Sequence, residues 1–258
     1  MITKKGSKHL VDVFLSADGL KDKAVVLVYF LKAPLKFLGH HDYQMIKPIK
    51  VKTQAGSFWS NRDIFSAIHL TQGYESAVRK KLELKEGAFI DIGANVGGLS
   101  LPVAAKNPKN RVVLVEPEPS NVAVIKKSLE ETSLKNVSLI EKGCFSKRGK
   151  LKLFKDDLGG SGRHSLLGTG DFWEIEVDTV DHMAFELGLK KVDLIKIDVE
   201  GVELQVLKGA KATIRRHRPR VVFEALNQEK LNGIGTFLKD KRYRIEQIDE
   251  RNYVAEPL

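Results

Sequence analysis

Short apolar runs and longer amphipathic stretches alternate along the chain from residue 87 onward. The apolar runs have the length of buried strands, and the stretches between them repeat apolar residues at helical spacing. Parallel strands need a crossover between them, so this alternation predicts an α/β fold with a mostly parallel, doubly wound sheet. The predicted strands are 88–93, 111–116, 137–143, 150–154, 173–177, 192–198 and 220–226, and the predicted helices are 98–107, 120–132, 179–188 and 202–216.

The two ends of the chain depart from this alternation. Residues 230–256 read as a helix followed by two strands joined across Asp249 to Asn252, which predicts an antiparallel C-terminal hairpin. Residues 21–41 read as one or two short helices interrupted by Pro34. We therefore expect a basic N-terminal helical extension at 1–70 and a second domain at 71–258.

Most of the excess positive charge lies near the N-terminus. Residues 1–60 carry ten lysines against four aspartates and no glutamate, a net +6 of the chain's +10. One interpretation is a packed helical extension with solvated lysines. The other is a patch for anionic lipid, nucleic acid or a charged glycan.

The sequence also bears on the compartment. The longest apolar run near the N-terminus, 24–31, is far shorter than the roughly 20 residues of a spanning helix. Asp12 and Asp18 break the pattern of a secretory signal. Cys144 is the single cysteine, which excludes an intramolecular disulfide. We expect a cytoplasmic protein, with peripheral membrane contact left open and the oligomeric state not indicated.

In an open parallel sheet, ligands bind at the carboxyl ends of the strands. Glycines after the first strand would let the chain approach a ligand closely, and Glu116, 23 residues after Gly93, is placed to accept the hydroxyls of an adenosine ribose. The turn reads GANVGG, however, with Asn95 where a dinucleotide fingerprint has its second glycine. A loop that begins with an acid suits an ammonium and a carboxylate, as in the methionine part of S-adenosylmethionine. The candidate ligand-binding residues at these strand ends are Asp91, Gly93, Asn95, Gly97, Glu116, Pro117, Gly143, Cys144 and Asp198.

Four segments together resemble the FkbM family of S-adenosylmethionine-dependent methyltransferases: FIDIGANVGGLS, VVLVEPEPSNVAVIKKSL, VDLIKIDVEGVELQVLKGA and RPRVVFEAL. The resemblance implies the class I methyltransferase fold. It also implies that residues 91–97 hold the methionine part of the donor, that Glu116 holds the ribose and that the turn at Gly143 and Cys144 meets the adenine edge. Tyr74 and Glu75 match a pair common in the family, and the resemblance implies that they close over the donor.

Three residues are candidates for the chemical step: Asp198, Glu200 and His164. Asp198 ends the predicted strand 192–198 and Glu200 follows it, where a carboxylate would remove a proton from the methyl acceptor. A second interpretation, which we do not favour, has Asp198, Glu200 and Glu224 holding a hard divalent cation. His164 lies in a glycine-rich segment that reads as a flap, and it is either a base at neutral pH or an exposed loop histidine. Cys144 reads as a small buried residue rather than a nucleophile.

The acceptor is the least determined part. The resemblance implies O-methylation of a hydroxyl on a sugar or a related natural product. The basic charge leaves RNA as an alternative acceptor. However, the fourth strand ends in DVEG and lacks the Asn/Asp-Pro-Pro-aromatic signature of many enzymes that methylate base amino groups. A third hypothesis is a non-catalytic nucleoside-binding module that docks to a membrane or a glycan.

Overall fold

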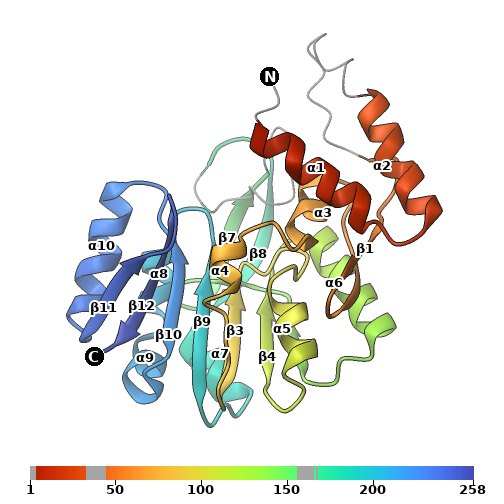
Figure 1. The fold of residues 1–258 in the computed structure, drawn as a ribbon. Coiled ribbons are helices and arrows are strands. Elements are labelled where there is room, and N and C mark those ends of the chain that lie inside the picture. The colour runs from red at the N-terminus through yellow and green to blue at the C-terminus, as the bar shows by residue number, and fades with distance from the viewer. Residues whose placement is uncertain (1–3, 33–44, 156–165, 167) are drawn as a thin grey trace.

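A seven-stranded sheet forms the centre of the computed structural model, which describes residues 4–32, 45–155, 166 and 168–258 (Figure 1). All neighbours from β10 to β5 pair in parallel, whereas β12 is antiparallel to both β10 and β11. The predicted doubly wound sheet is confirmed, and the C-terminal hairpin inserts its last strand next to β10. In spatial order the strands are β11 (Tyr243–Gln247), β12 (Asn252–Pro257), β10 (Arg220–Glu224), β9 (Val192–Ile197), β3 (Ala88–Ile92), β4 (Val112–Val115) and β5 (Val137–Ile140).

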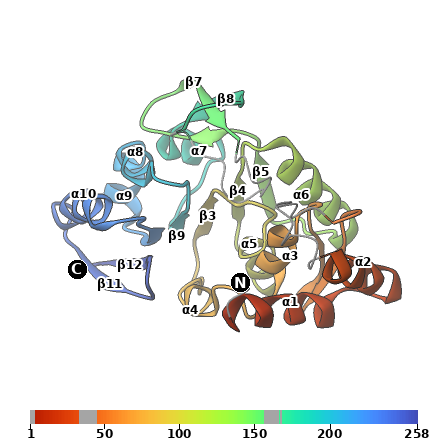
Figure 2. The ribbon, with the colours of Figure 1, turned by 90° about the horizontal axis from the view of Figure 1, so that it is seen from above.

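Helices cover both faces of this sheet (Figure 2). Successive side chains of a strand point to opposite faces, so the continuous apolar run of β3 serves two cores. Phe89 packs with the cluster that contains side chains of α5 (Ser100–Lys106) and α6 (Pro119–Thr132). Ile90 packs with the cluster on the other face, which contains side chains of four helices. Those helices are α7 (Val180–Glu186), α8 (Glu203–Lys208), α9 (Lys211–His217) and α10 (Gln228–Lys239).

The N-terminal part joins the first of these two cores. Buried Leu10, Val13 and Val25 belong to the same apolar cluster as Phe89. Besides the predicted helices, this part contains a β-hairpin that the sequence analysis did not predict. The division at residue 70 stays a prediction. The elements here are α1 (Lys4–Ser16), α2 (Leu20–Lys32), β1 (Lys50–Thr53), β2 (Gly56–Trp59), α3 (Ile64–Leu70) and α4 (Ser76–Arg79).

Two expected elements are divided in the structure. The predicted strand 137–143 leaves the central sheet after Ile140, and the chain continues in a separate three-stranded sheet of β6 (Gly143–Cys144), β8 (Phe172–Asp178) and β7 (Gly149–Phe154). The predicted helix 202–216 is two helices, α8 and α9. They meet at Gly209, where a Cβ atom would lie 2.2 Å from the carbonyl oxygen of Phe145. In the part of the chain that the structure describes, every helix is too short or too polar to cross a membrane.

Candidate active site

A cavity of about 430 Å³ opens at the carboxyl ends of β3, β4, β9 and β10. The structure brings together most of the side chains and turns that the sequence analysis selected. Gly97 lies outside the lining and packs against Leu101 beneath it. His164 lies outside the described residues. The selected residues that line the cavity are Tyr74, Glu75, Asp91, Gly93, Asn95, Glu116, Pro117, Gly143, Cys144, Asp198, Glu200 and Glu224.

Gly93 allows the first turn to pass directly over the end of β9. Its φ of +78° is a left-handed conformation, and an added Cβ atom would lie 1.8 Å from the carbonyl oxygen of Asp198. The N–H groups of Gly93 and Ala94 both donate to the carbonyl oxygen of Val115, at 3.0 and 3.2 Å. The turn is thus hydrogen-bonded to the end of β4 and lies directly against the end of β9.

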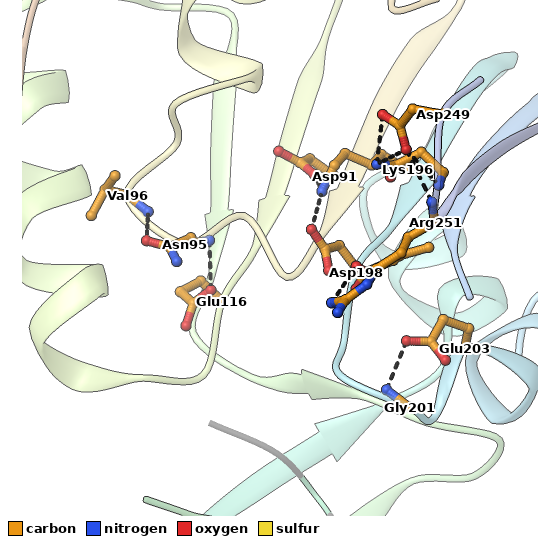
Figure 3. Close-up of polar contacts among 12 residues, drawn as sticks. Asp91, Asn95, Val96, Glu116, Lys196, Asp198, Gly201, Glu203, Asp249 and Arg251 are labelled. Carbon is orange, nitrogen blue, oxygen red and sulfur yellow. Dashed lines mark hydrogen bonds and ion pairs between the residues drawn. The ribbon is translucent and has the colours of Figure 1, made fainter. Parts of the chain in front are cut away.

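Glu116 lies buried at the end of β4, and backbone N–H groups hold its carboxyl group in one orientation (Figure 3). One oxygen accepts from the N–H of Asn95 at 2.7 Å, and the other accepts from the N–H of Glu118 at 3.0 Å. Burial raises the pKa of Glu116 to about 8, although these N–H groups act in the opposite direction. A group held in this way can accept hydrogen bonds from a ligand diol.

Lys196 is buried within β9 and forms an ion pair with Asp198 (Figure 3). Its Nζ atom lies 3.0 Å from Oδ2 of Asp198 and 3.9 Å from Oδ1 of Asp91. Burial alone would lower the pKa of Lys196, but Asp198 and Asp91 raise it well above its usual range. Burial alone would raise the pKa of Asp198, but Lys196 holds it below its ordinary value. Both partners therefore stay charged at neutral pH.

Asp91 is the most deeply buried acid of the cavity lining. Its Oδ1 atom is buried and has no hydrogen-bond partner in the described structure. Burial raises the pKa of Asp91, with Lys196 acting against this. An unsatisfied buried carboxylate oxygen costs free energy, so a donor group from a ligand would stabilise this position.

Three acids meet on the β9 and β10 side of the cavity. Carboxylate oxygens of Asp198, Glu200 and Glu224 lie within 4.8 Å of one another. Burial, together with repulsion from Asp198 and Glu200, raises the pKa of Glu224 to about 8. Arg251 lies nearby, with its Nη1 atom 3.6 Å from Oε1 of Glu224. The cluster has the composition to accept a proton or to hold a hard divalent cation.

The sequence analysis predicted that Tyr74 and Glu75 lie at the cavity but missed the helix α3 beside them, which supplies part of the same wall. His69, in α3, lines the cavity, and its ring centroid lies 4.4 Å from that of Tyr74. Burial lowers the pKa of His69 to about 4, so its imidazole is neutral. Burial also raises the pKa of Glu75 to about 6, while Lys196 acts against this rise. No local pattern around His69 could have indicated this position.

Backbone strain is concentrated around the cavity. Glu75, Asn95 and Glu200 have φ values of 46°, 53° and 53°, in the left-handed region that residues with a side chain rarely adopt. The other non-glycine residues with positive φ in the described chain follow helix ends: Ser133, Arg218 and Arg242. Strained residues of this kind persist where the surrounding structure holds them, which is typical of functional sites.

The remaining wall is apolar and comes mainly from the three-stranded sheet. Leu153 and Ile175 line it beside Gly143 and Cys144. Burial raises the pKa of the Cys144 thiol well above its usual range, so the thiol stays protonated. This agrees with a packing role for Cys144 and leaves an apolar surface of the kind that a flat aromatic base contacts.

The comparisons with known proteins agree with one another. Residues 91–245 match the model of the Methyltransferase FkbM domain. "Methyltransferase sdnD" of Sordaria araneosa is 27% identical over 153 residues, which cover 47% of this chain and 59% of that protein. "2-O-methyltransferase NoeI" of Sinorhizobium fredii is 26% identical over 154 residues, which cover 53% of this chain and 63% of that protein. Each match thus spans less than two thirds of the relative's length.

A solved structure agrees in fold. Methyltransferase FkbM from Methylobacillus flagellatus KT superposes with a TM-score of 0.53 and 18% sequence identity, over 71% of this chain and 47% of that one. The range matched by the family model takes in more than half of the chain and extends from Asp91 past Glu224, so it includes the strand ends that form the cavity. This chain therefore belongs to the FkbM methyltransferase domain family.

Proposed function

We propose that this protein transfers a methyl group from S-adenosylmethionine to a hydroxyl oxygen of a sugar or a related natural product. One observation carries the proposal. A single cavity combines a buried carboxyl group held by backbone amides, Glu116, with a cluster of acids at the ends of β9 and β10. The first arrangement suits recognition of a nucleoside, and the second suits removal of a proton.

The residues of the cavity fit the donor. The Oδ1 atom of Asp91, which lies 3.9 Å from Nζ of Lys196 but makes no hydrogen bond in the described structure, would hold the methionine part together with the turn at 93–97. Glu116 would accept the ribose hydroxyls. Gly143, Cys144 and the apolar side chains beside them would contact the adenine. When bound, the donor supplies an electrophilic methyl group on a sulfonium.

The acids at the ends of β9 and β10 would align the acceptor and remove its proton. Transfer to a hydroxyl requires that the oxygen be aligned and that its proton be removed. Asp198, kept charged by Lys196, would orient the hydroxyl. Glu224, with its pKa raised to about 8, is the stronger base when ionised and would take the proton. Glu200 lies within reach of both. His164, outside the described residues, stays either a base or an exposed loop histidine.

The name of one relative supports an oxygen acceptor, because NoeI is described as a 2-O-methyltransferase. The acid cluster supports the same class, since a hydroxyl must lose a proton whereas a thioether or a tertiary amine need not. A divalent cation on Asp198, Glu200 and Glu224 remains the second hypothesis for this step.

The proposal is tested by calorimetry with S-adenosylmethionine, followed by transfer of a labelled methyl group to separate panels of glycans, lipids and RNA. We expect donor binding and transfer to a hydroxylated glycan or natural product, with full activity in the presence of EDTA. Saturable transfer to RNA that weakens steeply with salt would show that the acceptor is RNA rather than a glycan or natural product. Donor binding without transfer to any panel would indicate a non-catalytic module. Loss of activity in EDTA, restored by Mg²⁺, would favour the metal hypothesis.

A further inference from the structure

Helix α2 is apolar on two opposite sides. Val25, Val26 and Tyr29 are buried against the core. On the opposite side, Leu20 and Leu31 are 86% and 70% exposed, and Leu27 lies between them at helical spacing. A helix that is apolar all round is normally covered on every side, so the outer side of α2 is unusual for a surface in water.

Helix α1, next to α2 in Figure 1, has the same arrangement. Leu10 and Val13 are buried, while Val11 and Leu15 are exposed on the other side, Leu15 by 66%. We call the exposed set Val11, Leu15, Leu20, Leu27 and Leu31 the apolar strip. Half of the ten exposed large apolar side chains of the described residues thus lie on two adjacent helices, a concentration of the kind found at interaction surfaces.

Lysines accompany the apolar strip. Lys8 and Lys21 are exposed on the same helices, and Lys23 is partly exposed. The acid of α2 is turned inward: Asp22 is buried, with one oxygen 3.2 Å from Nζ of Lys47 and the other accepting from the N–H of Lys50. The outer surface of α2 therefore presents leucines and positive charge, whereas its negative charge is neutralised inside.

We propose that the apolar strip docks this protein onto the surface of an anionic lipid membrane. Aliphatic side chains bordered by lysines are the pattern of a helix that lies in the membrane interface, where the leucines enter the acyl boundary and the lysines meet the anionic head groups. A second copy of the chain fits less well, because a two-fold contact would bring the same lysines against each other. Nucleic acid would use the lysines but not the leucines.

The inner side of α1 connects this surface to the cavity. His9 packs edge-on against Tyr74, with ring centroids 6.2 Å apart. Asp12 lies against Gly73 closely enough that a Cβ atom there would be 2.8 Å from its Oδ2 atom. Tyr74 and Glu75 line the cavity. Docking through α1 and α2 would hold this wall of the cavity near the membrane, where an acceptor carried by a lipid would be presented.

The test is sedimentation of the full chain with vesicles of phosphatidylcholine alone and with vesicles that also contain phosphatidylglycerol. We expect binding to the anionic vesicles that weakens with salt. The variant Leu20→Ser/Leu27→Ser/Leu31→Ser should lower the vesicle partition coefficient by at least about tenfold. Lys8→Glu/Lys21→Glu should abolish the preference for anionic vesicles. The matched controls are Phe185→Ser on α7, where the side chain is 79% exposed, and Lys190→Glu/Lys211→Glu at exposed lysines elsewhere. Both should bind as the wild type does.

Thermal melting and donor calorimetry establish that each variant is folded, and they read out the proposed function separately from docking. The proposal is overturned if the wild type binds neither kind of vesicle, or if the leucine variant binds as well as the controls. It is also overturned if light scattering shows a stable dimer of the wild type that the leucine variant converts to monomer, since the strip would then be a contact between two copies.

Discussion

The two halves of the cavity wall hold their carboxyl groups in different ways. At the end of β4, Glu116 is held by N–H groups of the backbone. At the ends of β9 and β10, Asp198 is paired with Lys196, and Glu224 lies near Arg251. Glu116 is also more deeply buried than Asp198 and Glu224, whose side chains are 29% and 16% exposed, so the two halves differ both in the partner and in the depth.

This difference indicates that one half of the cavity binds the donor and the other half carries out the proton transfer. Backbone amides cannot move far, so a carboxyl group that they hold presents fixed acceptor positions, which suits recognition of a donor. A cluster of acids with cations close by can gain or lose a proton as its charge balance changes, which suits chemistry. We expect substitutions in the two halves to separate binding from turnover.

The largest effect should come from the turn that joins the halves. Gly93→Ala places a Cβ atom against the carbonyl oxygen of Asp198 in a left-handed backbone. We expect a loss of about 3 kcal/mol or more in the free energy of unfolding, together with loss of donor binding. Gly188→Ala is the matched control, since Gly188 has a φ of 60° but open space around its Cβ position. Denaturant unfolding that shows equal losses for both variants would contradict the close approach.

The next effect concerns turnover in the β9 and β10 half. Asp198→Asn removes the charge paired with Lys196, and we expect kcat to fall roughly 100-fold to 10,000-fold with donor affinity nearly unchanged. Asp193→Asn is the control on the same strand, because Asp193 lies at the other end of β9 and accepts from the N–H groups of Glu86 and Gly87. Full residual activity of Asp198→Asn would remove this residue from the mechanism.

In the β3 and β4 half of the cavity, a substitution should weaken donor binding rather than turnover. Glu116→Gln keeps the shape of the side chain but replaces one acceptor oxygen by a donor group. We expect the donor Kd to rise about 10-fold to 100-fold in calorimetry, because a charge-assisted hydrogen bond is lost. Glu131→Gln, on the exposed side of α6, serves as control. An unchanged Kd for Glu116→Gln would place the ribose elsewhere.

The smallest effect is a pH dependence of donor affinity. With its pKa raised to about 8, Glu116 is protonated near neutral pH and becomes a full acceptor only above that pH. Donor affinity should therefore rise by up to about tenfold between pH 7 and pH 9 and level off above. Calorimetry in buffers with different ionisation enthalpies should detect release of a proton on binding. A flat profile in the wild type, or a profile that persists in Glu116→Gln, would contradict this assignment.

The parts of the fold that follow local patterns were predictable. The apolar runs of β3, β4, β9 and β10 have a strand's length and are buried on both faces, so sequence periodicity identifies them. The separate sheet of β6, β8 and β7 was not predicted, because strand pairing depends on contacts between residues distant in the chain. The position of β12 between β10 and β11 could not be predicted from the sequence for the same reason.

The residues of the site, too, could be predicted only in part from the sequence. Glu116 and Asp198 directly follow the ends of β4 and β9, and Asp91 is the last residue but one of β3, so a topological rule selects all three. His69 reaches the cavity only through the packing of α3. Lys196 lies within a strand, where an unpaired charge would be costly, and two carboxylates from neighbouring positions explain its burial. Such partners come from the folded sheet rather than from adjacent sequence.

The central claim is that the cavity binds S-adenosylmethionine through Glu116, while the acids opposite act on the acceptor. It is tested most directly by calorimetric titration of the wild type, Glu116→Gln and Asp198→Asn with S-adenosylmethionine and its demethylated product. The account predicts similar binding for the wild type and Asp198→Asn, and much weaker binding for Glu116→Gln. Absence of binding in the wild type, with uptake of a nicotinamide dinucleotide instead, would contradict it.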